Sequence, residues 1–87
     1  MLDVRFCALG SEGIAAIVEG LKVNTSVEKL LALTNHLGAD SIEPMRSLIE
    51  HSTSLKYIDV QDNLFPPQGK KVLREAADAK PGLVLVL

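Results

Sequence analysis

Few residue combinations in this sequence could do chemistry, and the two short motifs that come nearest each lack a required residue. Gly69-Lys70-Lys71 is similar to the end of a phosphate-binding loop, in which backbone N–H groups and a lysine hold the phosphates. That loop needs a glycine five residues before Gly69, where Leu64 stands, and a serine or threonine in place of Lys71. Gly10-Ser11-Glu12-Gly13 lacks the G-x-S-x-G spacing of a nucleophilic serine.

The two histidines and the single cysteine do not form a metal site. His36 and His51 have no cysteine or carboxylate partner at the spacing of metal ligands, and no such ligand set accompanies Cys7. Because no acid, base and nucleophile come together, we expect a protein that is not an enzyme and that uses no cofactor and no metal.

Length and composition predict one small domain with an aliphatic core. The chain has 87 residues, of which 47% are apolar and 23% charged, and its net charge is −2. This balance provides no strongly basic surface, so we expect no nucleic-acid partner. No apolar run approaches the length of a membrane-spanning helix, about 18 residues, so we expect no membrane contact. One cysteine cannot form an internal disulfide and fits a reducing compartment, which predicts a cytoplasmic location.

The strongest signal is an internal repeat with a spacing of 28 residues. Residues 27–37 (VEKLLALTNHL) align with residues 55–65 (LKYIDVQDNLF), and the pattern extends back to Leu2 and forward to Leu83. Nearly all of its apolar positions hold large apolar side chains, with Ala32 the weakest. Its polar position is filled in turn by Cys7, Asn35 and Asn63.

The second half of each unit has the periodicity of a helix. Apolar residues recur at i, i+3, i+4 and i+7 over residues 14–21, and the same face returns in residues 42–49 and 72–77. Each unit is therefore expected to be a short strand followed by a helix that packs against it.

The shared pattern L-x-x-L-x-L-x-x-(N/C)-x-L, in units of this length, resembles the leucine-rich repeat of the ribonuclease-inhibitor type. The resemblance implies an α/β fold: a short leucine-rich-repeat solenoid, or horseshoe segment, with a parallel sheet on the concave face and helices on the convex face. We expect a single domain over residues 1–87, divided into a partial unit 1–26, units 27–54 and 55–82, and a terminal strand 83–87. The resemblance also implies that the Asn or Cys side chain of each unit bonds backbone groups in the bend after the strand.

Residues on the predicted concave face are candidates for binding a protein, because apolar and charged side chains mix there. Leu31 and Leu33 are expected to point outward together, near Phe6 and Tyr57. The predicted protein-binding residues are Asp3, Arg5, Phe6, Lys29, Leu31, Leu33, Tyr57, Asp59 and Gln61.

An alternative register, shifted by one residue, would turn this face into the core. Leu31 and Leu33 would then replace Leu30 and Ala32 as the inward pair. The shift would move Asn35 out of its predicted place, which favours the original register.

The expected function is a non-catalytic protein–protein interaction module, the C-terminal part of a longer protein of this repeat class. Relatives of the class leave two alternatives: a regulator of an enzyme, such as an activator of a small GTPase, or an architectural segment of a cytoskeletal or axonemal assembly. The uncharged segment Leu83–Leu87 would make an apolar edge strand, so self-association through it is a further expectation.

Overall fold

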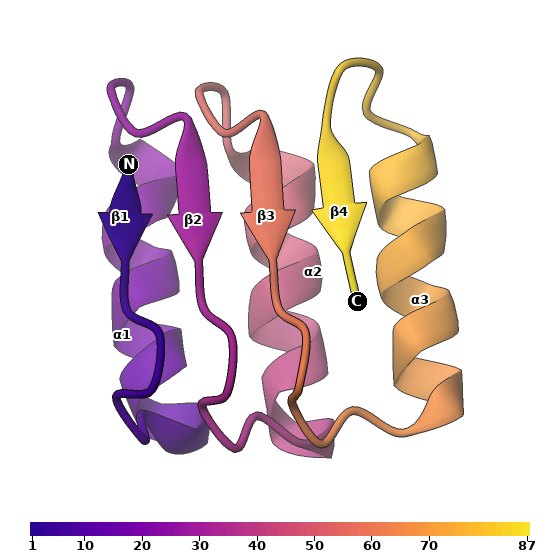
Figure 1. Cartoon of the computed structure of the whole chain (residues 1–87). Helices are drawn as coiled ribbons and strands as arrows, with labels where there is room; N and C mark the ends of the chain where they lie inside the picture. Colours follow the sequence, from indigo (N-terminus) through magenta and orange to yellow (C-terminus); the bar gives the residue numbers. More distant parts are fainter.

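Strands and helices alternate along the chain and form two layers, a parallel sheet and a row of helices (Figure 1). The computed structural model describes residues 1–87. The strands are β1 (Leu2–Asp3), β2 (Lys29–Leu31), β3 (Tyr57–Asp59) and β4 (Val84–Val86). The helices are α1 (Gly10–Val23), α2 (Ile42–His51) and α3 (Pro67–Asp78), with a short 3₁₀ helix η1 (Ala39–Ser41) before α2. The α/β class predicted from the repeat is therefore confirmed.

The four strands lie side by side in the order β1-β2-β3-β4, and all of them are parallel. Leu2 pairs with Leu30, and Leu30 pairs with Ile58, at the spacing seen in the sequence. Each helix returns the chain to the start of the next strand, and all three helices cover the same face of the sheet (Figure 1). We call the other side of the sheet, which no helix covers, the open face.

The core lies between the sheet and the helices and is aliphatic. Leu30, Ala32 and Ile58 contribute fully buried side chains from the sheet layer. The fully buried side chains of the helices are Ile14, Val18, Met45, Leu48, Ile49 and Leu73. Burying one large aliphatic side chain contributes about 1.5–3 kcal/mol. Because Leu30 and Ala32 are buried while Leu31 and Leu33 are only half-buried, the register is the predicted one and the one-residue shift is excluded.

Two asparagine side chains hold the loops that follow β2 and β3. Asn35 Oδ1 accepts hydrogen bonds from the backbone N–H of Cys7 (3.0 Å) and of Leu9 (3.3 Å). Its Nδ2 donates to the carbonyl oxygens of Val4 (2.8 Å) and Leu33 (3.2 Å). One side chain thus satisfies backbone groups of its own unit and of the unit before it.

Asn63 repeats this arrangement one unit later. Its Oδ1 accepts from the N–H of Asn35 (2.9 Å) and of Leu37 (3.0 Å), and its Nδ2 donates to the carbonyl oxygen of Ala32 (3.1 Å). Cys7, in the same position of the first unit, is exposed, and its thiol donates only to the carbonyl oxygen of Arg5 (3.4 Å). The two asparagines therefore have the predicted role, and the cysteine has only a weak form of it.

The structure corrects the predicted horseshoe solenoid. The molecule measures 26 × 24 × 17 Å along its principal axes, so it is almost as wide as it is long. Four short strands and three helices form a two-layer block, because so few units cannot extend into an arc.

A second correction concerns the last strand. The repeat spacing aligned Val86 with Ile58, whereas the structure pairs Leu85 with Ile58 and Val84 with Tyr57. The third unit is one residue shorter, because α3 ends at Asp78 and not at the position that corresponds to His51 in α2.

The asparagine bonds predict a large difference between two substitutions at equivalent positions. Asn35→Ala leaves part-buried N–H and C=O groups without partners, so we expect the free energy of unfolding to fall by about 1–3 kcal/mol. Cys7→Ala is the matched control and should change it by less than about 0.5 kcal/mol, because the thiol is exposed. Urea denaturation of both variants measures the difference, and similar losses would contradict the role given to Asn35.

Two helical glycines should respond to alanine in opposite directions. A Cβ at Gly69 would meet the side chain of Ile42, with Cγ1 at 2.8 Å, so Gly69→Ala should destabilise the fold by about 1–2 kcal/mol. Nothing lies within 4 Å of a Cβ built at Gly20, and Gly20→Ala should stabilise it by about 0.5–1 kcal/mol. Thermal unfolding separates the two, and a stabilising Gly69→Ala would show that α2 and α3 are not in close contact there.

Candidate functional site on the open face of the sheet

The predicted binding residues lie in the first three strands or directly after them. Asp3, Leu31 and Asp59 form one row across the sheet, since they are paired in the parallel register. Backbone pairing continues beyond the strands, where the N–H of Phe6 donates to Leu33 O (3.2 Å). Because side chains alternate along a strand, these rows face away from the buried leucines and lie on the open face.

Asp3 and Arg5 form a bidentate ion pair at one side of this face. Arg5 Nε donates to Asp3 Oδ1 (2.9 Å), and a terminal guanidinium nitrogen donates to Oδ2 (2.7 Å). These side-chain bonds, and a further bond from the Arg5 backbone N–H, hold the pKa of Asp3 below its usual value. The same carboxylate raises the pKa of Arg5. The pair is exposed and fixes the direction of the guanidinium at the surface.

The middle of the open face is apolar and carries one cation. Leu31 and Leu33 are half-buried, so part of each side chain is available to a partner. The Lys29 ammonium lies 5.1 Å from the centre of the Tyr57 ring, within the range of a cation–π interaction. The structure therefore brings together apolar side chains and a positive charge on this face.

Asp59 differs from the prediction because it is only 7% exposed. It lies between Leu31 of β2 and Val86 of β4, which shield it on both sides. Its Oδ1 accepts from the backbone N–H of Gln61 (3.1 Å), and its Oδ2 lies 3.4 Å from Gln61 Nε2. Asp59 therefore orients Gln61 and offers little surface of its own.

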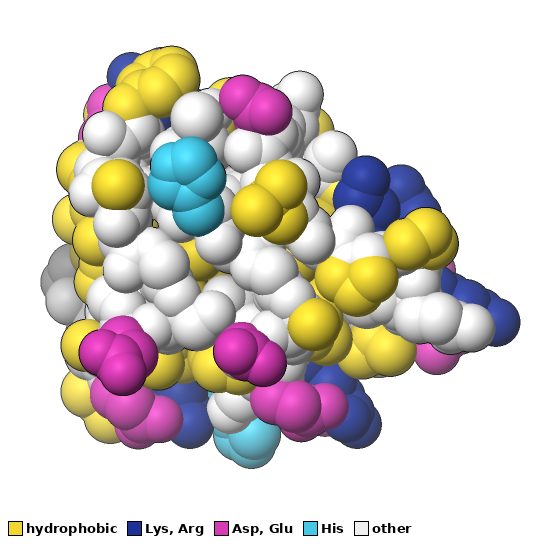
Figure 2. Space-filling model, turned by 90° about the horizontal axis from the view of Figure 1, so that it is seen from below, with side chains coloured by type: hydrophobic (Ala, Val, Ile, Leu, Met, Phe, Trp, Pro, Cys, Tyr) yellow, Lys and Arg dark blue, Asp and Glu magenta, His cyan; other side chains and the backbone are white.

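The turns after the strands add a second exposed region at the carboxyl ends of the strands. Phe6, Thr34 and Asp62 occupy equivalent places in these turns, and all three have a positive φ, between 55° and 59°. Phe6 is 73% exposed, and Thr34 Oγ1 donates to Asp62 Oδ2 (2.9 Å). Figure 2 looks at this end of the molecule and shows hydrophobic side chains spread over it, with acidic ones mainly along the lower margin and a few at the upper one.

Two features of this region were not predicted from the sequence: the exposure of Leu64 and the bond between Thr34 and Asp62. Leu64 is 67% exposed, although it lies in an apolar stretch that ends in the buried Phe65. The repeat could have indicated its exposure, since Leu64 is equivalent to the exposed Ala8 and His36. The bond between Thr34 and Asp62 could not be inferred, because it depends on the left-handed turns.

The structure shows no arrangement suited to metal binding or to crossing a membrane. No group of three or more His, Cys, Asp or Glu side chains is placed to hold a metal ion. None of the three helices is both long and apolar enough to span a bilayer.

Comparisons with known proteins find the same fold in solved structures. No protein-family model matches the sequence, and no curated protein matches it. One solved structure is actin-binding site 2 of leiomodin-1, with a TM-score of 0.78 and 13% identity over 87% of this chain and 44% of that chain. Another is the tropomodulin C-terminal domain from Caenorhabditis elegans, with a TM-score of 0.79 and 18% identity over 99% of this chain and 53% of that chain. The chain thus spans about half the length of these structures, and at such identities the likeness shows the fold alone.

These comparisons correct the resemblance to ribonuclease-inhibitor-type leucine-rich repeats. The matching structures are tropomodulin and leiomodin domains, and no family model supports the leucine-rich-repeat assignment. The assignment was wrong because the spacing of apolar residues indicates only which side chains face the core. It predicted the order of strands and helices and did not determine the family.

The ion pair on the open face predicts a shifted titration of Asp3. Because its folded pKa is lowered, the stabilisation from the pair is present above the ordinary pKa of an aspartate and is lost as the pH falls through the lowered value. Arg5→Gln should raise the pKa of Asp3 towards its ordinary value, as followed by NMR titration of the carboxyl carbon. Lys29→Gln, which removes another cation of this face, should leave the Asp3 titration unchanged. Equal Asp3 titrations in the native protein and in Arg5→Gln would contradict the pairing.

Proposed function

We propose that this chain is a non-catalytic protein-binding module that uses its open face within a cytoskeletal assembly, with actin as the partner. The observation that carries the proposal is the open face itself, which no helix covers (Figure 1). It displays Leu31, Leu33 and Tyr57 among fixed charges. An apolar centre with a polar rim is the composition of a protein interface. Phe6, at 73% exposure, extends this surface beyond the strands.

The fold supports actin as the choice of partner. One of the structures with this fold is an actin-binding site of leiomodin-1. Because this chain spans about half of that structure, the affinity of the chain for actin is part of the proposal.

The charged groups support a binding role over a catalytic one. The two groups with shifted pKa values, Asp3 and Arg5, are exposed and are shifted mainly by each other. Such a pair offers a partner a fixed carboxylate and a fixed guanidinium. A cytoskeletal role would also agree with the cytoplasmic location expected from the single cysteine.

Self-association through the last strand stays a prediction within this proposal. β4 lies at the edge of the sheet, carries no charged residue and has Val84 exposed. Such an edge can pair with a strand of another chain.

Co-sedimentation with filamentous actin, and gel filtration with monomeric actin, test the proposal. Phe6→Asn removes the exposed ring, and asparagine tolerates the left-handed backbone at this position, so the fold should be kept. We expect binding to weaken about 5- to 30-fold, the effect of losing an aromatic contact at an interface. Val23→Ser is the matched control, because Val23 is 83% exposed at the end of α1, outside the strands and turns of the proposed surface.

Three outcomes would count against the proposal. Absence of binding to both forms of actin would remove actin as the partner. Equal weakening by Phe6→Asn and Val23→Ser would place the contact elsewhere. Actin binding that Phe6→Asn and Leu33→Ser both leave unchanged, in folded protein, would remove the open face as the site.

A further inference from the structure

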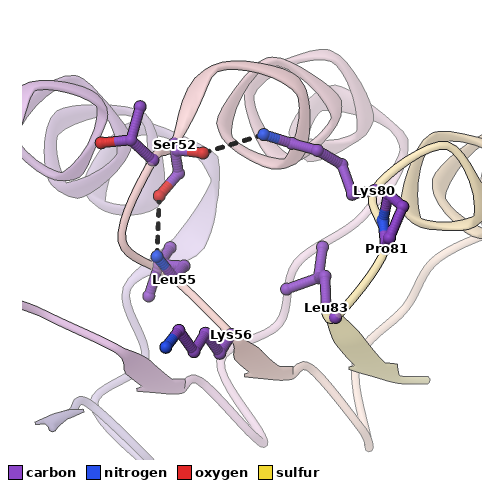
Figure 3. A pocket seen from close by; sticks show the side chains of 8 residues that line it. Ser52, Leu55, Lys56, Lys80, Pro81 and Leu83 are labelled. Atoms are coloured by element: carbon purple, nitrogen blue, oxygen red, sulfur yellow. Dashed lines mark hydrogen bonds between the residues drawn. The ribbon is translucent and has the colours of Figure 1, made fainter.

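A hollow of about 520 Å³ opens at the other end of the sheet, where β3 and β4 begin (Figure 3). It lies between the segment that joins α2 to β3 and the segment that joins α3 to β4. Its lining residues are Ser52, Thr53, Leu55, Lys56, Lys80, Pro81, Gly82 and Leu83. Two of these eight are lysines and none is acidic, so the hollow is cationic.

The hollow exists because the third joining segment departs from the repeat. The three segments are aligned at the repeat spacing as Asn24-Thr25-Ser26, Ser52-Thr53-Ser54 and Lys80-Pro81-Gly82. Between the first two, the Ser54 hydroxyl closes the space, since Oγ lies 3.1 Å from Asn24 O and 2.7 Å from Val27 O. The third segment has no hydroxyl side chain: at the observed register of β3 and β4, Pro81 corresponds to Ser54, and nothing lies within 4 Å of a Cβ built at the following Gly82.

The side chain of Lys80 is held at the edge of this hollow. Its Nζ donates to the carbonyl oxygen of Ser52 (2.9 Å), just beyond the end of α2. Because the Ser52 carbonyl group is neutral, it does not compensate the positive charge of Lys80. The ammonium has three N–H groups, so two of them remain to donate to a ligand. Figure 3 shows Lys80 and Ser52 on the helix side of the hollow and Lys56 on the sheet side.

Lys56 has one counter-charge, in a long and exposed ion pair. Its nearest carboxylate is Glu28, with Nζ 3.8 Å from Oε1, and both side chains are mostly exposed. An exposed pair at this distance contributes little and is easily replaced. Between the two lysines, Leu55 and Leu83 provide an apolar wall that could contact the methylene groups of a ligand.

We propose that this hollow binds a glutamate or aspartate side chain of an acidic peptide segment in a partner protein. The carboxylate would lie between the two ammonium groups, and the methylene stem of the residue would contact the leucines. The site is separate from the open face, so it does not depend on the role proposed for that face.

NMR titration of ¹⁵N-labelled protein with acetylated, amidated tetraglutamate at low salt tests the site. We expect shift changes to cluster at the backbone amides of Thr53, Lys56, Gly82 and Leu83. Lys56→Gln should weaken binding about two- to fivefold, the effect of losing one exposed charge contact. Lys80→Met, which keeps the stem and removes the charge, should weaken it similarly. Lys71→Gln is the matched control, because Lys71 is an exposed lysine of α3 that does not line the hollow.

Inorganic phosphate, titrated in the same way, separates a peptide site from a general anion site. Phosphate that shifts the same amides while tetraglutamate does not would overturn the proposal. Equal weakening by Lys71→Gln and Lys56→Gln would do so as well, because the peptide would then follow net charge and not the hollow. Thermal unfolding of each variant shows that a loss of binding is not a loss of fold.

Discussion

The structure depends on the hydrogen bonds that Asn35 and Asn63 make to the backbone of the preceding unit. A parallel strand that ends in a tight turn leaves N–H and C=O groups without strand partners, and burying them unpaired costs about 1–3 kcal/mol each. One amide side chain provides both an acceptor and a donor, so it satisfies groups of both kinds at once. Every buried polar side-chain atom of the chain has a partner, including those of Asn35. The strands can therefore be short, since the turns after them add to the pairing between units.

This arrangement separates the side that builds the fold from the side that is free to bind. The asparagines and the aliphatic side chains facing the helices hold the units together, and the helices cover one face of the sheet only. Substitutions on the open face therefore change the surface with little effect on the core. Where surface groups pair, as Asp3 does with Arg5, the bond gives a side chain a fixed direction. The third joining segment shows the same freedom, since it has no hydroxyl side chain in the place of Ser54 and leaves a hollow without breaking the stack.

The sequence predicted the parts of the structure that follow from spacing and failed where local geometry decides. The repeat predicted the burial of Leu30 and Ala32, because burial depends on which residue stands at which position. The resemblance built on that repeat implied the parallel order of the strands and the bonds of Asn35. The repeat misplaced β4 by one residue, since α3 ends early in its unit. It also placed Asp59 at the surface, although the width of its neighbours Leu31 and Val86 buries it. The repeat could not determine the family, because sequences of different families can have the same pattern of buried positions.

Amide hydrogen exchange of the native protein tests the role of the asparagines most directly. The N–H groups of Cys7, Leu9 and Leu37 lie outside regular strands and donate to asparagine side chains. If these bonds hold the units together, those amides should exchange nearly as slowly as the amides of Leu30 and Ile58 in the core strands, through the same opening of the fold. Exchange at the rate of exposed loop amides, while Leu30 and Ile58 stay protected, would contradict this account.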